Sequence, residues 1–274
     1  MKGGIVRSIG LYVVVAVILL YTLFPIYTLV LLAFTPFAHA SSGSYQLGLY
    51  PTGFTLSALM AALAIPQLTL AFYKSLEVAF IVGGLALLIG VPAAYGLSRL
   101  SPAIANSIST VLFLANMLPS ITIAIPISVT FIRLGLFQTP LSLALAQELV
   151  VLPLTVFLLL GAFQSVPKDL LNQARVDGSG LFRTIFTMLV PLARAGVASA
   201  FFLSWMISWD EFTFAVFLSA AKPTLPILIY IYITRGNILA AAAFSIIVTI
   251  PVIILVIALS RFLKAEVLSG GLNG

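Results

Sequence analysis

Cysteine is absent from this chain of 274 residues, and His39 is its only histidine. Without cysteine the chain can form no disulfide bond, no reactive thiolate and no cysteine metal site. A single histidine cannot build a histidine metal cluster either. The sequence therefore predicts no metal site.

Charged side chains are the second scarce class. They make up 7% of the residues, against about 25% in ordinary soluble domains. Hydrophobic residues make up 62%, and the mean hydropathy is +1.22. Several apolar runs are long enough to cross a hydrocarbon core, which takes about 20 helical residues. Because lipid cannot hydrogen-bond an exposed backbone, we predict an all-α integral membrane protein.

The apolar runs predict about six transmembrane helices within a single domain, residues 1–274. Proline residues 119 and 126 should break or bend the third span. Small residues every fourth position, as in Ala86, Gly90 and Ala94, indicate close helix packing in the second span. The predicted spans are residues 9–34, 72–97, 108–134, 141–162, 192–218 and 239–263.

The distribution of basic residues predicts the orientation of these spans. If the N-terminus is cytoplasmic, nine lysines and arginines fall inside and four outside, which satisfies the positive-inside rule. Both termini and residues 166–178 then lie in the cytoplasm, and residues 35–71 form an extracytoplasmic loop with a short helix near residues 56–63. The net charge of +6 does not indicate nucleic-acid binding, because the basic residues form no single face.

The N-terminus also has some features of a signal peptide. Small residues surround His39 as they would a cleavage site, but the apolar run over residues 9–34 exceeds the about 7–15 residues of a signal-peptide core. We therefore expect an uncleaved first span.

Residues 166–178 form a polar segment between the fourth and fifth spans. Pro167 suits the first turn of a helix, and Asp169 favours the positive end of its dipole. Leu170, Leu171 and Ala174 fall on one face of this predicted helix. Gly178 is a typical helix stop. Two interpretations remain open from the residues alone: a helix that docks on a partner protein, or a solvated connector.

The same segment resembles the EAA loop of the permease subunits of binding-protein-dependent ABC importers. The similarity includes Pro167, Asp169-Leu170, Ala174-Arg175 and Asp177-Gly178, followed by Val190-Pro191-Leu192. Further similarities occur in the family's order along the chain. They are Ala93–Arg99, Leu134-Gly135-Leu136 with Thr139, Trp209–Phe212, and the glycine-rich end at Gly270–Gly274, which resembles that of MalG-type sugar permeases.

This resemblance implies the type I importer permease fold, with residues 166–178 as a cytoplasmic coupling helix. In that family the helix docks on a cytoplasmic ATPase, whose ATP-driven closure switches the spans between inward and outward access. It implies a second homologous permease subunit, two ATPase subunits and an extracytoplasmic solute-binding protein as partners in the cell membrane. ATP and magnesium would be bound by the ATPase subunits, and this chain would be no enzyme. Consistently, the sequence has no P-loop.

One departure from the family concerns its Glu-Ala-Ala triplet, which here reads Asn172-Gln173-Ala174. Asn172 can hydrogen-bond but cannot form a charged pair with an ATPase arginine. We expect Leu170, Ala174 and Gly178 to provide shape, and the charged residues to provide polar anchoring. The residues expected to dock on the ATPase are Pro167, Asp169, Leu170, Leu171, Asn172, Ala174, Arg175, Asp177 and Gly178.

Asp210 and Glu211 are carboxylates in or near the end of the predicted fifth span. Such groups usually face a cavity or a partner, so three interpretations stay open: polar contacts between helices of two permease subunits, a substrate path, or a proton relay. Trp209 could stack on a sugar. The candidate path residues are Asn116, Ser120, Thr122, Ser204, Ser208, Trp209, Asp210 and Glu211. Lys222 and Arg235 belong to an outside segment that in the family approaches the binding protein.

The predicted function is thus that of a permease subunit of an ATP-driven importer, working by alternating access. The MalG-like features favour a sugar, a mono- or disaccharide. The alternatives are an importer for a polyamine or phosphate, a proton-coupled secondary transporter that uses Asp210 or Glu211, and a membrane scaffold without transport.

Overall fold

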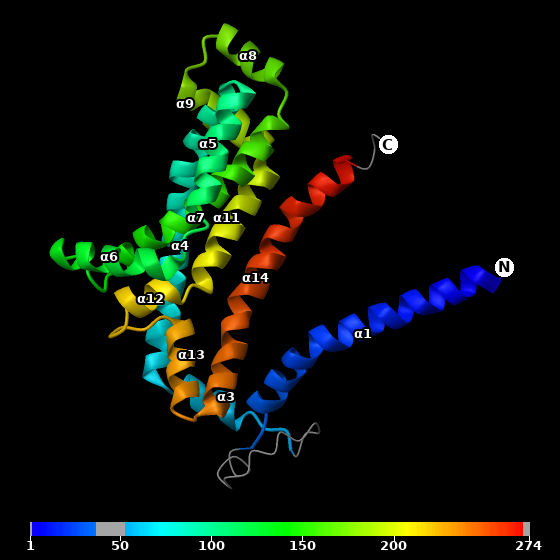
Figure 1. Ribbon diagram of the computed structural model, residues 1–274, viewed down its shortest axis with the longest axis vertical. Helices are drawn as coiled ribbons and strands as arrows, with labels where there is room; N and C mark the ends of the chain where they lie inside the picture. The colour runs from blue at the N-terminus through cyan, green and yellow to red at the C-terminus, as the bar shows by residue number, and fades with distance from the viewer. Residues whose placement is uncertain (1, 37–52, 271–274) are drawn as a thin grey trace. The chain divides into compact units, whose positions relative to one another are not determined.

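The computed structural model describes residues 2–36 and 53–270, except for the side chains of residues 2–9, 168, 175 and 261–270. All regular elements in these ranges are helices (Figure 1). They are α1 (Lys2–Ala33), α3 (Ser57–Leu63), α4 (Pro66–Arg99), α5 (Pro102–Ala115), α6 (Ser120–Arg133), α7 (Pro140–Gln164), α8 (Lys168–Val176), α9 (Leu181–Thr184), the π-helix η1 (Ile185–Leu189), α10 (Val190–Leu192), α11 (Arg194–Trp209), α12 (Thr213–Leu218), α13 (Leu225–Thr234) and α14 (Ile238–Gly270).

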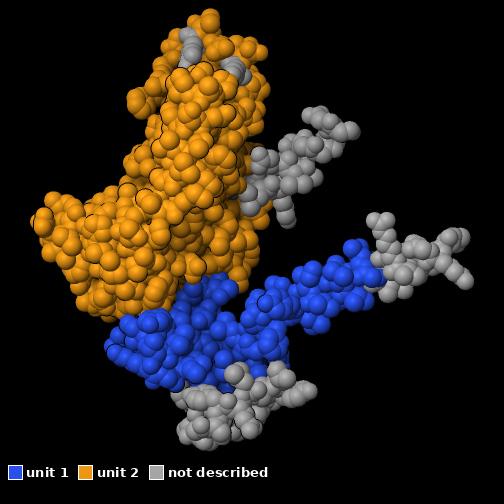
Figure 2. All heavy atoms as spheres, viewed as in Figure 1, with its two compact units in different colours: residues 1–69, 228–250 blue, residues 70–227, 251–274 orange. Residues whose placement is uncertain are grey.

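The chain divides into two compact units, coloured separately in Figure 2. One contains residues 1–69 and 228–250, and the other contains residues 70–227 and 251–274. In the first unit Tyr232 of α13 packs its ring against Phe244 of α14, with centroids 4.8 Å apart. The second unit holds most of α4 and all of α5 to α12, and with them the predicted coupling helix.

The membrane-spanning helices agree with the predicted number of spans. Four helical stretches are long and apolar enough to cross a membrane by themselves: Gly10–Ala33, Pro66–Arg99, Pro140–Gln164 and Ile238–Ser260. Two bent helix pairs raise the number to six if each pair is one span. The prediction of an all-helical membrane protein is confirmed.

The third predicted span, residues 108–134, is not one helix. It consists of α5 and α6, which meet at a bend of 83°. Asn116 ends α5, and Pro119, which has no N–H, stands at the start of α6. Inside the bend the Asn116 side chain donates a hydrogen bond to the carbonyl of Val150 in α7 at 2.8 Å.

The fifth predicted span, residues 192–218, begins close to the start of α11 at Arg194 but does not form one helix. The residues before it are helical as α9, η1 and α10, and they meet α11 at a bend of 88°. The bend lies at Ala193, whose φ of −96° and ψ of 21° leave the α-helical region. Pro191 lies just before it and the π-helical turn precedes both, features that commonly accompany sharp kinks.

At its other end the fifth span stops at Trp209, nine residues earlier than predicted. A carboxylate explains the break. Glu211 accepts hydrogen bonds from the backbone N–H groups of Phe214 at 2.7 Å and Ala215 at 3.1 Å. These are first-turn donors of α12, which have no partner inside their helix, so Glu211 starts a new helix instead of continuing α11.

Two shorter elements complete the comparison with the prediction. The short helix expected near residues 56–63 is present as α3. The apolar helix α13 was missed, because the segment around it was taken as an outside loop. Residues 37–52 of the predicted outside loop, among them His39, and the part of the glycine-rich end after Gly270 lie outside the described residues.

Small residues set the helix spacing within the second unit. Ala86, Gly90 and Ala94 of α4 are all buried, and a Cβ on Gly90 would meet Leu159 and Thr155 of α7 at 3.2 and 3.3 Å. The approach of α11 to α7 is closer still, since a Cβ on Gly196 would lie 2.2 Å from that of Ala162. The predicted small-residue seam is therefore confirmed as a packing surface.

Candidate functional site

Helix α8 is the short polar helix that the sequence predicted between the fourth and fifth spans. Its acidic residue Asp169 lies in the first turn, where a carboxylate favours the helix dipole. Its end is a Schellman motif. Gly178 has a φ of +77°, and the N–H of Ser179 donates to the carbonyl of Ala174 at 2.9 Å. The helix lies at one end of the group formed by α4, α5, α7 and α11 (Figure 1).

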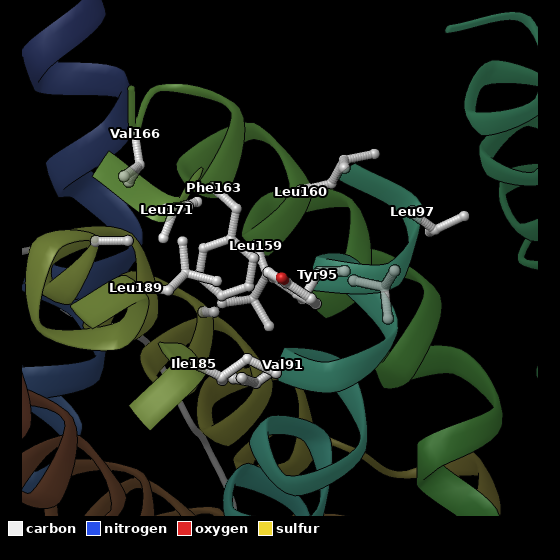
Figure 3. Packing of buried hydrophobic residues seen from close by; sticks show 14 residues of the cluster. Val91, Tyr95, Leu97, Leu159, Leu160, Phe163, Val166, Leu171, Ile185 and Leu189 are labelled. Carbon is white, nitrogen blue, oxygen red and sulfur yellow. The ribbon is translucent and has the colours of Figure 1, made fainter. Parts of the chain in front are cut away.

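One face of α8 is packed against its own chain. Leu171 is 3% exposed and Ala174 is 5% exposed. Leu171 belongs to a hydrophobic cluster with Phe163 and Val166 at the end of α7 and with Leu189 of η1 (Figure 3). The predicted apolar face is therefore real, but these two side chains hold α8 to the chain and leave almost no surface for a partner.

The opposite face of α8 is open. Asp169, Asn172, Gln173 and Asp177 are exposed, and Val176 is 88% exposed. Together with Val176 the four polar residues line a shallow hollow on the surface. Positions 169, 172, 173 and 176 follow the spacing of one helix face.

Two residues of this open face, Gln173 and Val176, were absent from the sequence-based set of docking residues. Helical spacing from Asp169 and Asn172 would have found both. Pro167 is exposed and directly precedes the helix, and Leu170 is half-buried. The Arg175 side chain lies outside the described residues.

A second polar group links α7, α11 and α12. The hydroxyls of Thr155 and Ser204 are 2.7 Å apart. One turn of α11 further on, Ser208 donates to the Oε1 atom of Gln147 at 2.5 Å. The Gln147 amide then donates to a carboxylate oxygen of Glu211 at 3.4 Å.

This group satisfies polar atoms in the interior. Thr155, Ser204, Ser208 and Gln147 are all buried, and buried polar atoms without partners would destabilise the helix pair. The Glu211 carboxylate receives further bonds from the start of α12. These hydrogen bonds of Glu211 lie within one chain, between α7 and the start of α12. The predicted contact between two permease subunits stays a prediction.

The candidate path residues do not form one surface in this conformation. Trp209 is 4% exposed and its ring stacks on Trp205 at 4.9 Å between centroids, so it offers no face to a sugar. Ser204 and Ser208 are buried in the contact between α7 and α11. Asn116 bonds α7, and Ser120 is half-buried. Only Thr122 and Asp210 of the eight are exposed.

The predicted outside segment, residues 219–237, is held to α4 by hydrogen bonds between α4 side chains and its backbone. The Lys74 ammonium donates to the carbonyl of Lys222 at 2.9 Å, and the Ser219 hydroxyl donates to the same carbonyl at 2.6 Å. Ser75 accepts from the N–H of Leu225 at 2.8 Å. The Lys222 side chain is exposed, and so is that of Arg235, which lies in the turn after α13.

Comparison with known proteins agrees with this architecture. Residues 86–268 match the family described as binding-protein-dependent transport system inner membrane component. The chain is 29% identical over 279 residues to the inner membrane ABC transporter permease protein YcjP of Escherichia coli (strain K12), covering 97% of this chain and 96% of that protein. It is 30% identical over 231 residues to the sulfoquinovosyl glycerol transport system permease protein SmoH of Agrobacterium fabrum (strain C58 / ATCC 33970), covering 82% and 80%.

A solved structure gives the same fold. It is that of a bacterial ABC transporter involved in the import of the acidic polysaccharide alginate, and one of its chains superposes with a TM-score of 0.77. The match covers 95% of this chain and 98% of that chain at 19% sequence identity. At that identity the likeness establishes the fold.

Proposed function

Because this chain belongs to the family of binding-protein-dependent transport system inner membrane components, a family of non-catalytic membrane subunits, we propose that it is a permease subunit of an ATP-driven sugar importer. It is a multi-pass membrane protein. In the proposed complex it pairs with a second permease, two cytoplasmic ATPase subunits and an extracytoplasmic solute-binding protein. The ATPase subunits bind ATP and magnesium and carry out the hydrolysis.

The observation that carries this proposal is the two-sided construction of α8. Its apolar side is buried on α7 and η1, while its polar side and Val176 stay open. A polar helix with a fixed inner face and an open outer face is suited to receive a force from outside the membrane. We therefore assign the open face, formed by Asp169, Asn172, Gln173, Val176 and Asp177, as the docking surface for an ATPase subunit.

The contacts of α8 indicate how its movement reaches the membrane interior. Leu171 packs in one cluster with Leu189 of η1, and η1 continues through α10 into α11. Helix α11 is bonded to α7 through Ser204 and Ser208. A displacement of α8 would therefore move α11 against α7. That movement would have to stretch or break the hydrogen bonds that Ser208 and Glu211 make with Gln147 of α7.

The positive-inside rule supports an orientation with both termini and α8 in the cytoplasm. In that orientation the backbone-tied segment around Lys222 and the turn at Arg235 face the binding protein. Asp210 and Thr122 are the exposed path candidates, and we propose that substrate meets them in this conformation. The buried candidates Ser204, Ser208 and Trp209 could meet substrate only after α11 has moved.

A sugar substrate is supported by the relatives. SmoH is named for sulfoquinovosyl glycerol transport, and the solved transporter imports alginate, a polysaccharide. An exposed carboxylate at Asp210 suits the hydroxyl donors of a mono- or disaccharide, because an ionised carboxyl group is a pure acceptor.

The test is uptake by proteoliposomes that contain the assembled complex and its binding protein. Labelled mono- and disaccharides should accumulate only when ATP is present on the ATPase side. An ATPase subunit with its P-loop lysine replaced should abolish uptake. Accumulation driven by a proton gradient in vesicles holding this chain alone, without ATP, would contradict the proposal.

A further inference from the structure

A pocket lies near α8 where α4 and α7 end and α5 begins. Its volume is about 270 Å³, and its polar lining comes from Ser98, Arg99, Asn106 and Gln164. Phe163 and Leu171 contribute to its apolar lining. At roughly 30 Å³ per water molecule the pocket has room for a phosphate group and part of its attached chain.

Arg99 is the charged group in this pocket. Its guanidinium carbon lies 4.9 Å from the centre of the Tyr95 ring, which places a cation over an aromatic face. A cation–π contact of this kind uses no N–H donor in a hydrogen bond. Among the described residues the buried Nε and Nη2 atoms of Arg99 have no hydrogen-bond partner.

The Arg99 side chain is half-buried, and an anion in the pocket would supply an acceptor for its two buried, unpartnered nitrogen atoms. Charged donors that are removed from water and left unbonded are unfavourable, and the described lining of this pocket contains no carboxylate. The Nε and Nη2 edge is the fork that binds phosphate or carboxylate through two parallel bonds. Ser98 and Asn106 supply neutral polar groups beside it.

We propose that this pocket binds the phosphate of an anionic phospholipid headgroup, with Arg99 as its main ligand. The lining combines polar and apolar residues at the ends of spanning helices, where a lipid can present both a headgroup and a chain. Basic pockets between transmembrane helices on the cytoplasmic side are suited to such headgroups, so this inference uses the orientation given under the proposed function. Because Leu171 of α8 lines the same pocket, the bound lipid contacts the base of the coupling helix and restrains it.

The test measures lipid binding to the purified full-length chain in detergent. Native mass spectrometry would follow titration with dioleoylphosphatidylglycerol, with dioleoylphosphatidylcholine as the zwitterionic comparison. We expect Arg99→Gln to weaken phosphatidylglycerol binding by about tenfold, the loss of a charge-assisted hydrogen bond. Arg183→Gln is the matched control, since Arg183 is exposed at the same end of the spans, and it should leave binding unchanged.

A second variant covers the case in which Arg99→Gln fails to fold. Asn106→Leu places an apolar side chain at the pocket lining without touching Arg99, and it should weaken binding in the same direction. Competition by inorganic phosphate separates the two sources of the anion. If phosphate displaces the lipid at similar affinity, the site is one for free phosphate; if it does not, the site is one for lipid.

Equal phosphatidylglycerol binding by wild type, Arg99→Gln and Asn106→Leu would overturn the inference. A wild-type chain that binds neither phosphatidylglycerol nor phosphate would overturn it as well. That result would indicate that the pocket binds an acidic segment of a partner protein. Neither result depends on ATP, a binding protein or a sugar. Failure here is therefore distinct from failure of the proposed importer function.

Discussion

Helix α8 and the junction between α11 and α12 both carry acidic residues in a chain that has few, but they use them in opposite ways. In α8 the carboxylates of Asp169 and Asp177 are exposed, and the contacts that hold the helix are apolar. At the junction Glu211 turns inward and bonds two backbone N–H groups and Gln147. Asp210 beside it stays exposed.

The difference separates residues that need a partner protein from residues that complete the fold. A carboxyl group that already has its hydrogen bonds inside the chain has little left to offer a ligand, so we propose a structural role for Glu211. Exposed polar groups on a helix that is fixed from behind can bind something else. We therefore propose the exposed face of α8 as the functional surface, and the same contrast separates Asp210 from Glu211.

The largest expected effect comes from removing the inward carboxylate. Glu211→Ala leaves the N–H groups of Phe214 and Ala215 without their acceptor, and we expect a loss of about 3 kcal/mol in the free energy of unfolding. Asp210→Ala, the neighbouring control, should change it by less than about 0.5 kcal/mol. Unfolding in dodecyl sulfate titrations would measure both. Equal losses would show that the two carboxylates do not differ as described.

The two faces of α8 can be separated in the same way. Leu171→Ala removes a buried side chain and should destabilise the chain by about 2 kcal/mol. Val176→Ala removes an exposed one and should leave stability unchanged while it weakens ATPase binding. Unfolding and pull-down with the ATPase subunit would be measured on each variant. If Val176→Ala destabilised the chain as much as Leu171→Ala, the open face would in fact be a packed one.

A smaller effect is expected at the end of α8. Gly178→Val forces a β-branched residue into a left-handed conformation, at about 1–2 kcal/mol, although a Cβ there would meet nothing within 4 Å. We expect the Schellman turn to rearrange and sugar uptake per ATP hydrolysed to fall by about tenfold. Gly180→Val is the control, because Gly180 has a φ of −68° and is equally open. Normal coupling in Gly178→Val with an assembled complex would refute the role given to this turn.

Sequence patterns predicted the elements whose signal is local. The lengths of the apolar runs predicted the spans. The helical spacing of residues 166–178, with Asp169 near the start and Gly178 at the end, predicted α8 and its end. The bend in span three was predicted at its prolines and lies at Pro119, whereas Pro126 stays inside α6. The end of α11 was placed poorly, because it depends on groups far apart in sequence. Asn116 finds its acceptor at Val150, and Glu211 starts α12 while it bonds Gln147.

The candidate site shows the same division. The two faces of α8 were predictable, since both follow helical spacing. The burial of Trp209 and Ser208 was not predictable, because it depends on how closely α11 approaches α7. The local sequence Trp209-Asp210-Glu211 does not show whether the tryptophan ring faces a sugar or stacks on Trp205, as it does in the structure.

The central claim is that the open face of α8 receives the ATPase, and cross-linking tests it most directly. The chain contains no cysteine, so Val176→Cys introduces a single reactive site on that face. Val129→Cys, an exposed valine of α6, is the matched control at the other end of the spans. In the assembled complex a short bifunctional thiol-to-amine reagent should join Val176→Cys to the ATPase subunit, in a yield that changes on ATP binding, and should not join Val129→Cys. Absence of an ATPase cross-link at Val176→Cys, with the complex intact and the thiol labelled, would contradict the account.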